Sequence, residues 1–267
     1  MTTTGRVRAE ATAAWHSFVR RRTAVFFTFL FPVILVVIFA VLVQTNPAGG
    51  GLFSQPPGYY LPGYLATVVL FTPLSRVGSE VARHRDGNRF EKLATTPLTR
   101  AEWLLAHTLV NVVIIGVAGL LILGLMALAT GTANLALAPT NLALVAVFVA
   151  VAVALFCGFG ALLGSLADSQ DGVIAASNTI ALPLLFLSNT FVTLDMLPAW
   201  FRPVTNLSPL TYFATGVRQL TYSAFGPDTV SLSAATVHDY WLTQLAVLSV
   251  LAVAFFAAGA YAIPRTD

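Results

Sequence analysis

Long, nearly uninterrupted runs of apolar residues constrain this chain more strongly than any other feature. A helix needs about 20 apolar residues to cross about 30 Å of bilayer hydrocarbon. Runs of sufficient length occupy residues 24–43, 59–83, 103–130, 141–167, 173–192 and 240–263. The alternating pattern of membrane barrel strands is absent from the sequence. We therefore expect an all-α integral membrane protein in which residues 1–267 form a single domain with six transmembrane helices.

The composition excludes a soluble or a disordered chain. Hydrophobic residues make up 57% of the sequence and charged residues only 9%, whereas a soluble domain has roughly a quarter charged residues. Disordered chains show the opposite pattern, with low hydrophobicity and high net charge. The single cysteine, Cys157, excludes an intramolecular disulfide framework and a cysteine cluster for a metal.

The positions of lysine and arginine predict the orientation in the membrane. Cytoplasmic loops are enriched in these residues. Of the 14 lysines and arginines, all except Arg202 and Arg218 lie before the first span, after the apolar part of the second span (which ends near Leu74) and before the third, or at the C-terminus. Residues 44–58 and 131–140 carry no charge, as expected of short translocated loops. We expect both termini inside, and basic residues that contact lipid headgroups rather than nucleic acid.

Residues 6–23 have the pattern of an amphipathic helix, with apolar and basic faces. A helix of this kind lies in the plane of the membrane interface, with its tryptophan at headgroup depth. An ordinary basic flank of the first span is the alternative. If it is an interface helix, its functional residues are expected to be Trp15, Phe18, Arg20 and Arg21.

The loop at residues 87–100, between the second and third spans, predicts a short, well-defined helix. Gly87 and Asn88 break the preceding helix, and Pro97 ends the short one. Thr99 and Glu102 form a capping box at the start of the third span. A plain connector needs only about four to six residues, so this loop is suited to receive force from a cytoplasmic partner. The expected contact residues are Arg89, Phe90, Glu91, Lys92, Leu93, Thr95, Thr96, Pro97 and Arg100.

A turn between the fourth and fifth spans carries Asp168 and Asp171. An aspartate at the centre of a membrane helix costs roughly 2.5–3.5 kcal/mol, so these residues favour a cytoplasmic turn over one merged helix. We consider two interpretations for the turn. It is either a second contact for a cytoplasmic partner or a solvated connection.

Residues 193–239 are longer than a connector and predict short helices in the outer leaflet. One begins at Leu197, and another has Ser208 as its N-cap and Pro209 in its first turn. Polar residues in membrane helices face the protein interior or a transport pathway, although hydrogen bonds between helices explain them equally well. An Arg76–Glu80 ion pair is compatible with their spacing. The candidate pathway or gate residues are Asn111, Asn178, Asn189, Tyr212 and Arg218.

Motifs that would make the chain an enzyme are missing. It has no GxxxxGK[ST] sequence, and its only lysine, Lys92, follows Glu91 rather than a glycine. HExxH and GxSxG are also absent. The apolar runs lack the string of acids that a proton or sodium relay needs. We expect a protein without catalytic residues, metal or cofactor of its own that obtains energy from elsewhere.

Two segments resemble a known family. The loop after the second span contains NRFEKLATTPLTRAEWLLA, which resembles the corresponding loop of ABC-2 (type 2 ATP-binding-cassette) exporter permeases. The segment before the last span contains LPAWFRPVTNLSPLTYFATGVRQL, which resembles the same family. The likeness covers essentially the whole chain and points to the branch that exports drugs and lipo-oligosaccharides.

The resemblance implies a permease subunit in the plasma membrane of a prokaryote. It would form a homodimer, or pair with a related permease, and bind a separate ABC ATPase subunit in a 2:2 complex. Residues 89–96 would be the coupling helix, and ATP and Mg would bind to the partner. The complex would export an amphipathic or lipid-linked substrate such as a drug, lipid or glycan. The alternative is a membrane scaffold or assembly subunit without transport activity.

Overall fold

The computed structural model describes residues 2–42, 55–131, 135–222 and 240–264. Its first half contains α1 (Thr3–Arg20), α2 (Arg22–Val36), the π-helical turn η1 (Val37–Leu42), the 3-10 turn η2 (Pro57–Tyr60), α3 (Leu61–Asp86), α4 (Arg89–Ala94) and α5 (Arg100–Thr130). Its second half contains α6 (Pro139–Leu166), α7 (Gln170–Leu187), the 3-10 turns η3 (Leu194–Met196) and η4 (Arg202–Leu207), α8 (Pro209–Thr221) and α10 (Tyr240–Ala262). Most of the predicted loop 44–58, the outer segment after Tyr222 and Arg265 lie outside these residues.

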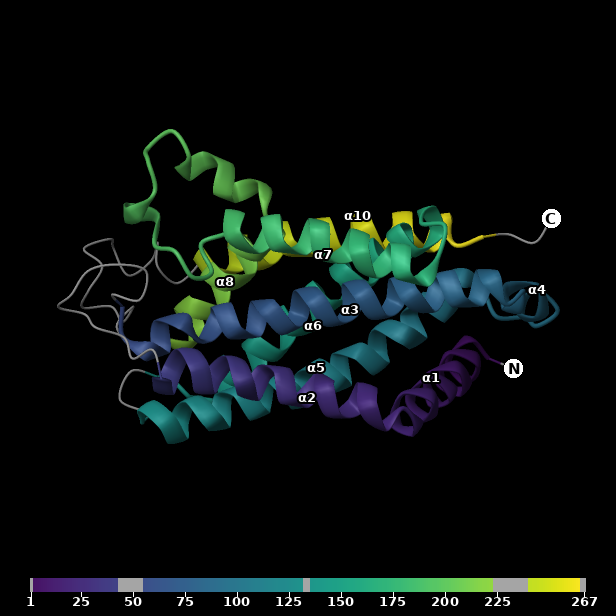
Figure 1. Cartoon of the computed structure of the whole chain (residues 1–267), viewed down its shortest axis with the longest axis horizontal. Helices are drawn as coiled ribbons and strands as arrows, with labels where there is room; N and C mark the ends of the chain where they lie inside the picture. The colour runs from purple at the N-terminus through teal and green to yellow at the C-terminus, as the bar shows by residue number, and fades with distance from the viewer. Residues whose placement is uncertain (1, 43–54, 132–134, 223–239, 265–267) are drawn as a thin grey trace.

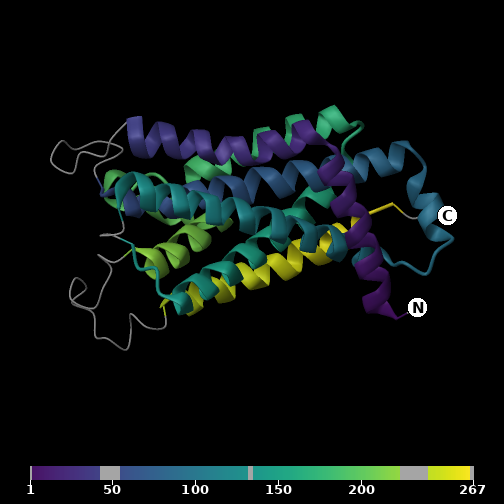
Figure 2. The same cartoon turned by 90° about the horizontal axis from the view of Figure 1, so that it is seen from below.

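Among the described residues, six helices are long and apolar enough to cross a membrane, which confirms the predicted all-α membrane fold. They are α2 extended into η1, α3 together with η2, α5, α6, α7 and α10. They run roughly along the long axis of the molecule (Figure 1). The start of α1, the end of α10 and α4 lie at one end of this bundle, which we call the α4 end. The opposite end, which carries α8, is the α8 end (Figure 2).

The centre of the bundle is α3 packed against α6. About 67% of the most apolar stretch of α3 is buried, against 17% for α2 and for α10. The peripheral helices α2 and α10 therefore present apolar residues outward, as expected of a protein whose solvent is lipid. The buried core around α3 and α6 includes Tyr64, Leu74, Phe148 and Phe156.

Glycines allow α6 to approach two neighbours closely. A Cβ atom on Gly164 would overlap the backbone of Gly78 in α3. On another face of α6, a Cβ atom on Gly259 of α10 would overlap the carbonyl of Gly158. Small residues in membrane helices permit this backbone contact, which supplies much of the packing energy where lipid removes the hydrophobic effect. These glycines therefore serve packing within the chain.

The fifth span is shorter than predicted. We expected it to reach residue 192, but α7 ends at Leu187. The Ser188 hydroxyl donates to the Leu185 carbonyl at 2.6 Å, and Ser188 itself has an extended backbone. A side-chain bond of this kind competes with continuation of the helix. Asn189 consequently lies beyond the span instead of within it.

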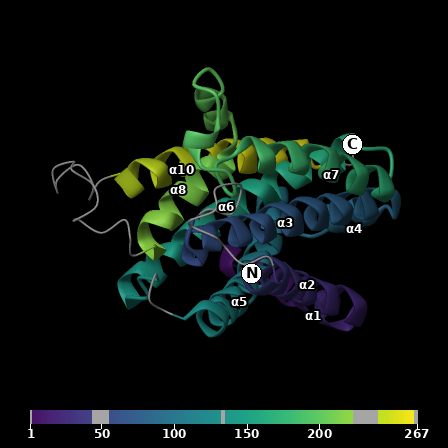
Figure 3. The same ribbon diagram turned by 60° about the vertical axis from the view of Figure 1, so that its left-hand side comes forward.

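The predicted helix start at Leu197 is wrong, because the segment between α7 and α8 projects from the bundle as turns and 3-10 helix (Figure 3). Pro203 has no N–H to donate to the carbonyl four residues earlier, and Val204 N–H bonds Phe201 O at 2.9 Å. α8 begins as predicted, with Ser208 as its N-cap residue and Pro209 in its first turn, but the Ser208 side chain makes no cap hydrogen bond. Its hydroxyl donates to the Leu184 carbonyl at 2.7 Å, one of the last four carbonyls of α7, which have no partner within the helix.

Candidate functional site

The α4 end holds a short helix that projects beyond the bundle (Figure 2). α3 ends at Asp86, Gly87 follows as its C-cap, and Asn88 adopts the left-handed conformation with φ 50°. Asparagine tolerates this conformation better than most residues, so the chain reverses here and α4 begins at Arg89. α4 ends at Ala94, and the hydroxyls of Thr95 and Thr96 donate to carbonyls of its last turn.

A cluster of rings fixes α4 to both neighbouring spans. Phe90 is 9% exposed, and its ring lies 5.4 Å from that of His84 in α3 and 5.5 Å from that of Trp103 in α5. Trp103 in turn lies 4.0 Å from the His107 ring. Phe90 therefore faces inward, and displacement of α4 would disturb α3 and α5 together.

The opposite face of α4 is exposed. The exposed residues of the predicted contact set are Arg89, Glu91, Lys92, Thr95, Thr96 and Pro97. Leu93 is half-buried and lines a hollow of about 610 Å³ between α4, the start of α5 and the end of α10. Arg100 lines the same hollow and donates to the Tyr261 carbonyl at 3.1 Å, which joins α5 to α10. The hollow is partly apolar and partly basic.

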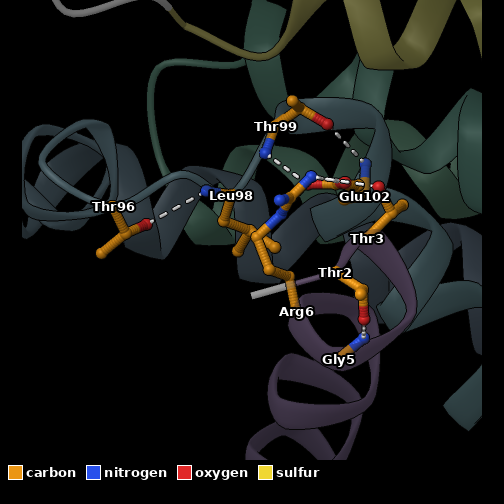
Figure 4. A network of polar contacts seen from close by, with 8 residues as sticks. All are labelled: Thr2, Thr3, Gly5, Arg6, Thr96, Leu98, Thr99 and Glu102. Carbon is orange, nitrogen blue, oxygen red and sulfur yellow. Dashed lines mark hydrogen bonds and ion pairs between the residues drawn. The ribbon is translucent and has the colours of Figure 1, made fainter.

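Glu102 connects this loop to the N-terminal helix (Figure 4). It completes the predicted capping box, in which Thr99 Oγ1 accepts from Glu102 N–H at 3.2 Å and Glu102 Oε2 accepts from Thr99 N–H at 2.9 Å. The same carboxylate accepts from Arg6 Nε at 3.1 Å and Arg6 Nη2 at 2.5 Å. Hydrogen bonding to this carboxylate raises the pKa of Arg6. Sequence reasoning found the cap but missed Arg6, because no local pattern links positions 96 residues apart.

α1 crosses the α4 end at a steep angle to the spans (Figure 2). Ala14 and Phe18 pack against Val110 and Ile114 of α5. Glu10 Oε1 lies 3.4 Å from His107 Nε2, and hydrogen bonding with this imidazole lowers the pKa of Glu10. The predicted residues Trp15, Arg20 and Arg21 are exposed, with Trp15 38% accessible.

The turn with Asp168 and Asp171 lies near the end of α3. Arg85 Nη1 donates to the Ala167 carbonyl at 2.6 Å, which joins α3 to the end of α6. Both aspartates are exposed. Asp171 is in the first turn of α7, where a negative charge is favourable.

The structure brings only some of the candidate pathway residues together. Asn111 is buried in α5 and donates to the His107 carbonyl at 2.9 Å. Asn178 lies on an exposed face of α7. Asn189 donates to Thr215 Oγ1 of α8 at 2.9 Å, and the Tyr212 hydroxyl donates to the Asn206 carbonyl at 3.0 Å. Asn189 and Arg218 meet at the α8 end.

Arg218 is 3% exposed, so its side chain lies inside the bundle. It donates to the carbonyls of Asn189 at 2.9 Å, Thr190 at 3.2 Å and Tyr59 at 3.2 Å. Its guanidinium also lies 4.0 Å from the centre of the Tyr59 ring. The residue therefore joins α8, the end of α7 and η2 at one point.

The predicted ion pair between Arg76 and Glu80 does not form. Glu80 pairs instead with Arg83 on its own helix and lies 3.9 Å from Arg21. The Arg76 guanidinium stacks on Phe18 of α1, 4.3 Å from the ring centre. Packing of α1 against the bundle supplies this aromatic partner, which helical spacing in α3 cannot reveal.

The sequence of this chain matches a known protein family and several known proteins over most of its length. The sequence profile of the ABC-2 type transporter family matches residues 6–222, a range that includes α1, α4 and α8. The daunorubicin resistance ABC transporter permease protein DrrB1 of Streptomyces coeruleorubidus is 26% identical over 208 residues, 74% of this chain and 70% of the relative. The inner membrane transport permease YadH of Escherichia coli is 22% identical over 247 residues, 91% of this chain and 90% of the relative.

Proposed function

Since this chain belongs to the ABC-2 type transporter family, we propose that it is the permease of an ATP-driven exporter whose ATP is hydrolysed by a separate subunit. The chain is a multi-pass transmembrane transporter subunit. The finer proposal is that two permeases and two ATPase subunits form the working complex in the plasma membrane of a prokaryote. ATP and Mg would bind to the partner, since the chain has no P-loop sequence.

The geometry of α4 carries this proposal. It is held between two spans by Phe90, while Arg89, Glu91 and Lys92 remain exposed on its outer side. The adjoining hollow of about 610 Å³ offers a recess for an apolar side chain of a partner. A charged, rigid projection of this kind is suited to dock on a soluble protein and pass its movement to α3 and α5.

We further propose that α1 moves with α4 as one unit. Glu102 holds both Thr99 at the end of the α4 loop and Arg6 in α1. Movement imposed on the loop would therefore also reach the helix at the membrane interface. The exposed turn with Asp168 and Asp171 would provide the second contact with the ATPase subunit.

α7 has an exposed face that carries a polar side chain, which is expected of a surface that contacts a second permease or lines the transport pathway. Asn178 lies on this face between Ile174 and Leu182, which are 41% and 47% exposed. An amide that faced hydrocarbon would lack hydrogen-bond partners. We propose that this face lies at the dimer contact or the pathway, and that Arg218 and Asn189 set the position of α8 as a gate at the outer end.

An amphipathic drug is our first candidate substrate. DrrB1 is named for daunorubicin resistance, which makes daunorubicin a suitable probe. Lipids and lipid-linked glycans remain within the same proposed substrate class.

Co-purification and transport test the proposal together. The chain should co-purify with a separate P-loop ATPase, and proteoliposomes with both subunits should move daunorubicin only with ATP. Arg89→Ala with Glu91→Ala should weaken the complex or uncouple hydrolysis from transport, whereas Arg202→Ala at the α8 end should leave both unchanged. An intact complex without ATP-dependent movement of any labelled compound would favour the scaffold instead.

A further inference from the structure

A cavity of about 370 Å³ opens between α1, α2 and α3 near the α4 end. It lies where the chain passes from α1 into the first span at Arg21 and Arg22. None of the contacts described for α4 uses this space. Its lining changes from basic and hydroxyl side chains near α1 to phenylalanines further along α2 and α3.

The polar part of the cavity contains two arginines. Arg76 Nη1 is buried and has no hydrogen-bond partner among the residues that the structure describes. Its guanidinium is held in place by the Phe18 ring, and Ser75 and Ser79 line the cavity on either side of it along α3. Arg21 lines the same space. A buried guanidinium N–H without an acceptor is costly, so this site favours an anionic oxygen.

The protein's own carboxylate in this cavity is already engaged. Glu80 lines the space but is bonded to Arg83, and it lies 3.9 Å from Arg21, beyond hydrogen-bonding distance. The cavity is therefore lined by two guanidinium groups, those of Arg76 and Arg21, and by the carboxylate of Glu80, which is already bonded to Arg83. Arginine binds phosphate oxygens in this way through planar pairs of N–H donors.

The apolar part of the cavity faces outward. Phe27 and Phe31 of α2 are 59% and 43% exposed, and Phe71 of α3 lies across from them in the lining. These rings extend the cavity along spans that cross the membrane. A small free anion would leave this surface without a contact, whereas hydrocarbon chains would cover it.

We propose that this cavity binds an anionic phospholipid, with the headgroup phosphate on Arg76 and Arg21 and the acyl chains along Phe27, Phe31 and Phe71. The position is consistent with a headgroup site, because α1 crosses the bundle at the end where α2, the first span, begins (Figure 2). The bound lipid contacts α1, α2 and α3 at once and so braces the position of α1. This inference does not depend on transport or on an ATPase partner.

Retention of phosphatidylglycerol by the purified full chain tests the site. Native mass spectrometry in a neutral detergent measures the lipid that stays bound across a titration. Arg76→Gln should weaken binding of the most tightly bound phosphatidylglycerol molecule about tenfold or more, because it removes charge-assisted hydrogen bonds to the phosphate. Arg8→Gln removes the same charge from an exposed position of α1 outside the cavity and should leave that binding unchanged.

Three further measurements separate the alternatives. Ser75→Leu fills the cavity without changing its charge and should also weaken binding, which keeps the test valid if Arg76→Gln fails to fold. Diacylglycerol, which lacks the phosphate, should not be retained. Equal retention by the wild type, Arg76→Gln and Ser75→Leu would overturn the proposal. Displacement of the lipid by an equal concentration of inorganic phosphate would also overturn it, because the phenylalanines would then contribute nothing.

Discussion

Arg6 and Glu102 lie 96 residues apart and form an ion pair through both oxygens of the carboxylate. The same Glu102 caps α5 through Thr99. One side chain thus fixes the N-terminal helix, the loop that carries α4 and the start of a transmembrane span. This shared contact makes α1 and the α4 loop mechanically dependent on each other.

Breaking the Arg6–Glu102 pair should loosen α1. Glutamine retains the ability to cap, so Glu102→Gln removes the charge while preserving the start of α5. Spin labels on Ala13→Cys in α1 and Leu109→Cys in α5 would report the change, since Cys157 is buried. We expect a broader distance distribution in Glu102→Gln and in Arg6→Gln, and no additional broadening in the double variant. An unchanged distribution in both single variants would contradict this role.

Low pH should release the same helix through Glu10. The His107 imidazole lowers the pKa of Glu10 below its ordinary value of 4.5. A carboxyl group with a lowered pKa stabilises the folded arrangement above its unfolded pKa, and the contribution is lost as pH falls through the folded value. The spin-label distribution should therefore broaden as the pH is lowered below about 4.5. In Glu10→Gln this pH-dependent step should be absent; its persistence would assign the step to another group.

Close packing of α3 on α6 should not tolerate a methyl group. Gly164→Ala would place Cβ against the backbone of Gly78, and backbone cannot rotate away as a side chain can. We expect a loss of about 2 kcal/mol or more in unfolding free energy, measured by thermal denaturation in detergent. Gly124→Ala in α5 is the matched control because its Cβ meets nothing within 4 Å. Equal stability of the two variants would show that α6 shifts without cost.

Loss of Arg218 should detach α8 from its neighbours. Arg218→Gln removes charged donors from the carbonyls of Tyr59, Asn189 and Thr190. A hydrogen bond to a charged group contributes about 1.5–3 kcal/mol, so a destabilisation of about 3 kcal/mol is expected in the same thermal assay. The exposed Arg202→Gln should change stability by less than about 0.5 kcal/mol. A comparable small effect for Arg218→Gln would remove it as an anchor of the proposed gate.

The features that local sequence determines were predictable. Apolar runs of membrane-spanning length identified the six spans, because a chain in hydrocarbon must satisfy its backbone by helix formation. Gly87 with Asn88 and Thr99 with Glu102 identified the end of α3 and the cap of α5, because each depends on residues at most three positions apart. The loop resemblance and the family profile then agreed on the class of protein.

Tertiary packing decided which polar side chains meet. The Arg76 guanidinium stacks on the Phe18 ring of α1 instead of pairing with Glu80. Arg218 donates to backbone carbonyls from two other segments, and Arg6 pairs with Glu102. Each outcome depends on residues brought together from distant parts of the chain. Helical periodicity specifies which face a residue occupies, but only the packed bundle specifies what that face contacts.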